Sequence, residues 1–135
     1  MKVVLDTHVL LWWKAKKSKL SRESAKAIQR AERILVSAVS CWELATLVTQ
    51  GRVKLDRSLQ EWVEALEAEE NVQILPLTAR VAVQIVQLDR AGFHGDPADR
   101  LIYATALDEL ASLITADERI HQFASANKPS VRVIW

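Results

Sequence analysis

Near its amino terminus the chain reads Val3-Val4-Leu5-Asp6-Thr7-His8, in which three apolar residues are followed directly by a carboxylate. A short apolar run of this kind is consistent with a buried strand, and residues 7–15 continue with the apolar spacing of a helix. The same order returns along the chain, where short apolar runs alternate with helical segments. This alternation predicts parallel strands joined by helical crossovers, with helices on both faces of the sheet.

Turn and capping signals set the limits of the expected elements. Ser21 caps a helix, Gly51 ends one, and Pro97 stands in the first turn of another, just after Asp96. The run from Val81 to Val86 is expected to be deeply buried. The predicted strands are residues 3–5, 33–37, 72–75, 112–115 and 131–135, and the predicted helices are 7–15, 21–32, 40–50, 58–70, 78–88, 97–110 and 117–124.

Length and composition narrow the class of protein. We expect residues 1–135 to form one domain, because this length is enough for a hydrophobic core and no linker divides it. The formal net charge of +1 excludes a strongly basic nucleic-acid coat. A single cysteine cannot form an internal disulfide. No apolar run approaches the roughly 20 residues of a membrane-spanning helix, and the amino terminus lacks a signal-peptide pattern, so the expected location is the cytoplasm, without membrane contact.

Four acidic residues stand where strand-like runs give way to helical segments: Asp6, Glu43, Asp99 and Asp117. The carboxyl ends of parallel strands lie along one edge of a sheet, where open α/β folds bind their ligands. Two carboxylates about 4 Å apart repel each other by roughly 4 kcal/mol at an effective dielectric constant of 20. A hard divalent cation such as Mg²⁺ or Mn²⁺ relieves this repulsion and also binds phosphate oxygens. The pattern therefore predicts a metal-dependent nuclease.

Each acidic residue also has a structural alternative. Asp6, Asp96 and Asp117 each stand just before a predicted helix, where an aspartate can cap it. Ser40-Cys-Trp-Glu43 matches a capping box, and Asp99 is favourable in a first helical turn through the helix dipole. Hydroxyl residues near the acids either orient carboxylates and metal-bound water or make local backbone hydrogen bonds. These hydroxyl residues are Thr7, Ser37 and Thr115.

Basic residues gather in two of the predicted connections, where they either follow a phosphate backbone or keep a loop solvated. Arg100, next to Asp99, meets a phosphate or pairs with an acid. No histidine or cysteine spacing indicates zinc, and no glycine-rich phosphate loop is present. The basic residues considered for RNA binding are Lys14, Lys16, Lys17, Arg52, Lys54 and Arg100.

Four blocks of the sequence together resemble the PIN domain, and more narrowly the VapC-type toxins of bacterial and archaeal toxin–antitoxin pairs. They are Leu5-Asp6-Thr7-His8, Ser37-x-x-Ser-x-Trp-Glu43, Asp96-Pro-Ala-Asp99-Arg100 and Thr115-Ala-Asp117. The resemblance covers essentially the whole chain. It implies a three-layer α/β/α sandwich, Mg²⁺- or Mn²⁺-dependent endoribonuclease activity, homodimerisation and neutralisation by a small antitoxin protein.

The same resemblance implies the roles of single residues. Asp6 and Asp99 become the principal metal ligands, and Glu43 and Asp117 complete the site directly or through water. Asp96 is assigned to capping or to support of the site, although its carboxylate is an alternative to Asp99 as the direct ligand. Thr7, Ser37 and Thr115 support the acids.

Three other functions remain open at this point. One is a PIN-fold nuclease of RNA processing without an antitoxin, and another is a catalytically silent module that binds RNA or protein. The third is a phosphatase with Asp6 as its nucleophile. This last function is disfavoured because His8 stands where such enzymes usually place a second aspartate.

Overall fold

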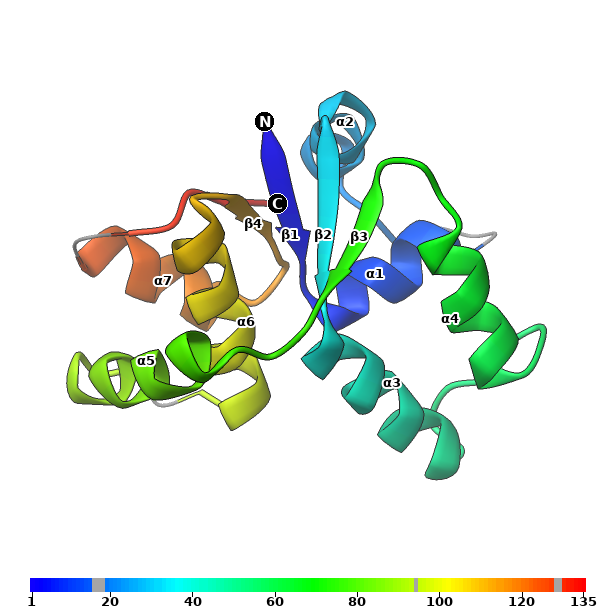
Figure 1. The fold of residues 1–135 in the computed structure, drawn as a ribbon. Helices are drawn as coiled ribbons and strands as arrows, with labels where there is room; N and C mark the ends of the chain where they lie inside the picture. Colours follow the sequence, from blue (N-terminus) through cyan, green and yellow to red (C-terminus); the bar gives the residue numbers. More distant parts are fainter. Residues whose placement is uncertain (16–18, 94, 128–129) are drawn as a thin grey trace.

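The computed structural model describes residues 1–15, 19–93, 95–127 and 130–135. Within these ranges, one sheet of five parallel strands lies between two layers of helices (Figure 1). This confirms the predicted α/β/α architecture. The strands are β1 (Lys2–Leu5), β2 (Arg33–Ser37), β3 (Val72–Leu75), β4 (Ser112–Ile114) and β5 (Val133–Ile134); the helices are α1 (Thr7–Lys14), α2 (Arg22–Arg30), α3 (Ala38–Thr49), α4 (Leu59–Glu67), α5 (Ala79–Arg90), α6 (Pro97–Glu109) and α7 (Glu118–Ala126).

Residues 3–5 of the central strand β1 are buried on both faces of the sheet, which explains why all three are apolar. Val4 faces a core formed with α5, α6 and α7, whereas Val3 and Leu5 face a second core formed with α1, α2 and α4. All three side chains are fully buried. Burial of one such side chain stabilises the fold by about 1.5–3 kcal/mol, so the two cores together fix the position of β1.

The strand order β3-β2-β1-β4-β5 makes β1 the point where the chain changes direction across the sheet. From β1 the chain first adds β2 and β3 on one side, and later adds β4 and β5 on the other. A crevice forms at the carboxyl edge of such a switch point because the connecting loops diverge there. The Asp6 amide donates a hydrogen bond of 3.1 Å to the Ile114 carbonyl, which joins the ends of β1 and β4 at this crevice.

Strand β2 passes into α3 without a loop. Ser37 is the N-cap of α3, and its hydroxyl accepts a hydrogen bond of 3.1 Å from the Val39 amide. The predicted capping box of Ser40 and Glu43 is therefore wrong, because both residues lie inside the helix. This earlier start frees Glu43 from a capping role.

The prediction of deep burial for the apolar run in α5 is also wrong. Val81 and Leu88 are buried, but Val83 is 69% exposed and Val86 is 51% exposed. Val81, Ile85 and Leu88 lie on the helical face that packs against the core, whereas Val83 and Val86 lie on the opposite side of the helix. In the described part of the chain, no helix has the length and apolarity needed to cross a membrane.

Candidate active site

Four acids from separate parts of the fold line one cavity of about 350 Å³ at the carboxyl edge of the sheet. Asp6 reaches it from the end of β1, Glu43 from α3, Asp99 from α6 and Asp117 from the turn after β4. Residues more than 100 positions apart in the sequence thus meet at one place. The other lining residues are Thr7, His8, Trp12, Asp96, Ala116 and Arg119.

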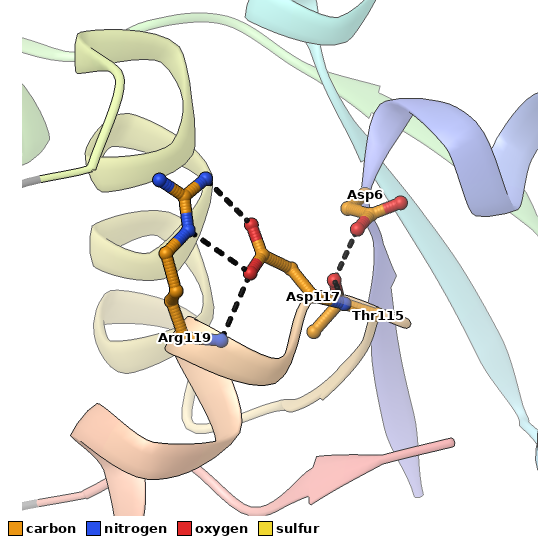
Figure 2. A network of polar contacts seen from close by, with 4 residues as sticks. All are labelled: Asp6, Thr115, Asp117 and Arg119. Carbon is orange, nitrogen blue, oxygen red and sulfur yellow. Dashed lines mark hydrogen bonds and ion pairs between the residues drawn. The ribbon is translucent and has the colours of Figure 1, made fainter.

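Two hydrogen bonds fix the carboxylate of Asp6. Its Oδ1 atom accepts a hydrogen bond of 2.9 Å from the Val9 amide, so Asp6 caps α1 as one alternative predicted. Its Oδ2 atom accepts a hydrogen bond from the Thr115 hydroxyl (Figure 2). Burial raises the pKa of Asp6 despite both bonds. Capping and a place in the acidic cavity are therefore compatible roles.

Asp117 is paired with a guanidinium group. Arg119 donates from Nη2 to Oδ2 at 3.2 Å and from Nε to Oδ1 at 3.4 Å, and Figure 2 shows its side chain turned toward that carboxylate. The Arg119 amide also donates to Oδ1 at 2.9 Å, which caps α7. Burial alone raises the pKa of Asp117, but the bonds from Arg119 outweigh it and hold that pKa below its ordinary value.

A hydroxyl group at the start of α1 fixes the position of the Glu43 carboxylate. The Thr7 hydroxyl donates to Oε1 at 2.5 Å, and Thr7 Oγ1 also lies 3.0 Å from the hydroxyl oxygen of Ser40. Thr7 and Ser40 are buried, so this contact is shielded from water. Thr7 and Thr115 thus contact the acids, whereas Ser37 makes the local backbone bond described above.

Asp99 lies at the centre of the negative charge. Burial is the largest influence on its carboxyl group, followed by the charges of Glu43, Asp117, Asp96 and Asp6, and together they raise its pKa to about 6. Asp96 occupies the N-cap position of α6, but its side chain makes no capping hydrogen bond. The capping role predicted for the Asp96 side chain is therefore wrong. Its carboxylate lines the acidic cavity instead.

Carboxylate oxygens are suitable ligands for a hard divalent cation. In this structure, however, three of these carboxylates contact protein groups. In the described ranges, no three histidine, cysteine, aspartate or glutamate side chains are placed to share one ion. Asp6, Glu43 and Asp117 each accept a hydrogen bond from a protein donor. Burial and the neighbouring negative charges raise the pKa of Asp99, so a cation placed beside this carboxylate would stabilise its ionised form. An ion shared by these acids must therefore compete with Arg119 for Asp117.

Of the basic residues considered for RNA binding, the four that the structure describes, Lys14, Arg52, Lys54 and Arg100, do not line this cavity. Lys14 pairs with Glu69 at 2.5 Å, and Arg100 lies 3.4 Å from Asp89 on α5. Arg52 and Lys54 are exposed in the connection between α3 and α4. Lys16 and Lys17 lie outside the described residues, as does His94.

The sequence analysis did not include Arg119 in this site. Its position two residues after Asp117, at the start of a helix, is the available signal, because side chains at this spacing can meet across a helix N-terminus. His8 and Trp12 were also given no part in the site. Both line the cavity, with their ring centroids 5.9 Å apart.

The chain is similar to known proteins over nearly its whole length. The PIN domain family profile matches residues 3–126. Ribonuclease VapC22 of Mycobacterium tuberculosis is 39% identical over 133 residues, which cover 98% of each chain.

Several solved structures have a similar fold. The structure of VapBC2 from Rickettsia felis bound to a DNA fragment from its promoter contains a chain with a TM-score of 0.68 and 17% identity, covering 98% of this chain and 97% of that one. Mycobacterium tuberculosis VapC20, described as a toxin that cleaves the sarcin–ricin loop, has a TM-score of 0.67 and 15% identity, covering 96% and 98%. At these identities the structural likeness establishes the fold alone.

Proposed function

The chain belongs to the PIN domain family, and from this premise we propose that it is a VapC-type endoribonuclease that hydrolyses phosphodiester bonds in RNA. The observation that carries the proposal is the meeting of Asp6, Glu43, Asp99 and Asp117 in one cavity at the carboxyl edge of the sheet. The 39% identity with a protein named as a ribonuclease supports the same activity.

The proposed site holds Mg²⁺ or Mn²⁺. Asp6 and Asp99 serve as principal ligands, and Glu43 and Asp117 complete the site directly or through water. A divalent cation bound among such acids supplies a Lewis acid, which lowers the pKa of the attacking water and offsets the charge of the phosphate. Carboxylate oxygens of this kind are the ligands that these ions prefer.

The protein contributes orientation. Thr115 holds the Asp6 carboxylate through a hydroxyl that is fully buried, and Thr7 does the same for Glu43. These bonds restrict the rotation of the two carboxylates, so less conformational freedom is lost when substrate binds. Arg119 supplies a positive charge at the mouth of the cavity, where its exposed side chain can reach a phosphate oxygen.

The proposed partners are a small antitoxin protein and a second copy of the chain. The names of several similar structures support the first: one contains VapBC2 of Rickettsia felis, and another, from Klebsiella pneumoniae, is described as a toxin–antitoxin complex. A basic segment of an antitoxin fits the acidic cavity by charge. The homodimer is an expectation from the family resemblance.

A cleavage assay tests the activity. The wild type is incubated with labelled single-stranded RNA in Mg²⁺, in Mn²⁺ and in EDTA, beside an Asp99→Asn variant purified in the same way. We expect cleavage by the wild type with either ion, none in EDTA, and none by the variant. Equal cleavage by wild type and variant would assign the activity to a contaminant, and no cleavage by either would favour a binding module.

A further inference from the structure

A second cavity, of about 490 Å³, lies beside the acidic one and shares three residues with it. Asp99, Asp117 and Arg119 border both cavities. We call the second one the α7 cavity, because residues 119–127 supply much of its lining. Its volume falls in the range of roughly 300–1,000 Å³ that is usual for small-molecule sites.

One wall of the α7 cavity is aromatic and held in place by packing. Phe93 and Phe123 meet edge to face with their centroids 4.8 Å apart, and both also contact Tyr103 in the core. Gly95 lies against this wall so closely that a Cβ atom there would be 2.7 Å from Phe93 Cε1. The wall is therefore formed before any ligand arrives.

The outer part of the α7 cavity carries polar groups. The Asn127 amide nitrogen donates to the Phe123 carbonyl at 2.8 Å, which fixes the amide and leaves its oxygen as an acceptor. Gln122 is exposed, and among the described residues its side-chain amide has no hydrogen-bond partner. Arg119 adds a planar guanidinium group at the border with the acidic cavity.

We propose that the α7 cavity binds one nucleobase of the RNA, from a nucleotide next to the phosphate that is cut; this inference rests on the proposed function. Single-stranded RNA is recognised by splayed bases that stack on aromatic or guanidinium planes and bond through their edges. The ring of Phe123, which is partly exposed, the amides of Gln122 and Asn127, and Arg119 supply these groups, whereas Phe93 is buried and holds Phe123 in place by packing. Because the two cavities adjoin, a phosphate at the acids leaves a neighbouring base within reach of the α7 cavity.

The polar groups favour a base over an apolar side chain of a protein partner. An apolar side chain would fill the aromatic part of the cavity but offer no hydrogen bond to the Gln122 amide or to the oxygen of the Asn127 amide. Buried polar groups that lose water without gaining a hydrogen bond weaken binding. A nucleobase satisfies both parts, because it has an apolar face and a polar edge.

The test uses a short synthetic RNA selected from a random-sequence pool by wild-type cleavage in Mg²⁺. Each nucleotide flanking the cut is replaced in turn by an abasic one, and kcat/KM is measured for every substrate. We expect one abasic position to lower wild-type kcat/KM by about tenfold or more, in line with the loss of one stacked base.

Variants locate that base. Ala126 lines the α7 cavity and is exposed, so Ala126→Trp fills the cavity without removing core contacts. It should lower kcat/KM on the intact RNA by a similar factor, and the sensitive abasic position should then have no further effect. Ser125→Trp places the same ring on the same helix outside the cavity and should behave like the wild type. Gln122→Ala should change which base is preferred at that position.

Several outcomes overturn the proposal. One is that no abasic position lowers kcat/KM. Another is that Ala126→Trp and the abasic substitution lower kcat/KM independently, so that their combined loss is the product of the two single losses. Unchanged kcat/KM in Ala126→Trp with weaker antitoxin binding would assign the cavity to the protein partner. Circular dichroism and thermal unfolding establish that each variant is folded. If the wild type selects no RNA at all, the proposed function itself fails, which distinguishes the two failures.

Discussion

Thr115 joins Asp6 to the turn that carries Asp117. Its hydroxyl donates to the Asp6 carboxylate and accepts a hydrogen bond of 3.1 Å from the Asp117 amide (Figure 2). The residue is fully buried at the end of β4, beside the central strand. One hydroxyl thus sets the positions of two acids that come from separate strands.

Replacement of Thr115 by valine should therefore strongly reduce RNA cleavage while the protein stays folded. The change keeps the shape of the side chain but removes both hydrogen bonds, and loss of a group that orients a metal ligand typically costs 10–100-fold in affinity or activity. We expect a loss of this size in RNA cleavage and about 1–2 kcal/mol in the free energy of unfolding. Thr115→Ser, which restores the hydroxyl, should recover most of the activity.

Arg119 should weaken cation binding by competing for Asp117. Removing the guanidinium in Arg119→Gln leaves Asp117 without its ion pair, so we expect Mn²⁺ to bind roughly two- to fivefold more tightly, a small effect as usual for an exposed pair. Isothermal titration calorimetry of metal-free protein measures this change directly. Arg119→Lys keeps the charge and should stay near the wild type; weaker Mn²⁺ binding by Arg119→Gln would contradict the competition.

Asp99 should make the metal-free protein less stable as the pH rises. Its pKa is about 6 in the folded protein, against about 3.9 in an unfolded chain. The folded state therefore binds more protons between these two values, and its stability falls as the pH rises from about 4 to about 6. In EDTA, Asp99→Asn should raise the free energy of unfolding at pH 7.5 by about 1–2 kcal/mol, a figure reduced for solvent screening.

The pH dependence of this gain is the control. Near pH 3.5 the wild-type carboxyl is mostly protonated in both states, so the wild type and Asp99→Asn should unfold at nearly the same urea concentration. A stability difference that persists unchanged at that pH would mean that the substitution acts by packing and not by charge.

The sequence was sufficient for the fold because the determinants of the strands are local. The limits of β2 and β3 match the prediction, since β2 carries the apolar run Ile34-Leu35-Val36 between Arg33 and Ser37, and β3 lies between Asn71 and Pro76. The convergence of the acids also followed, because parallel strands all end at one edge of the sheet. In contrast, the start of α3 was misplaced, since Ser37 and Ser40 are both acceptable caps; in the structure Ser37 caps the helix and Glu43 contacts Thr7 instead.

The partners of charged side chains were the least predictable part. Lys14 and Arg100 were considered for RNA binding, but they contact Glu69 and Asp89 through helix packing that no local pattern reveals. Arg119 was missed for the related reason that its role depends on which way an exposed side chain turns. Long, charged side chains have many rotamers of similar energy, so the spacing of residues alone does not decide which contacts they make.

Titration of the metal-free protein with Mn²⁺ measures whether these acids bind a divalent cation. Asp6→Asn removes the charge but keeps a residue that caps α1 equally well, so the fold should be unchanged. Glu118→Gln, an exposed change next to Asp117, is the matched control. We predict saturable Mn²⁺ binding by the wild type and Glu118→Gln, and a loss of at least about tenfold in affinity in Asp6→Asn. Equal Mn²⁺ affinity in all three proteins would contradict the account.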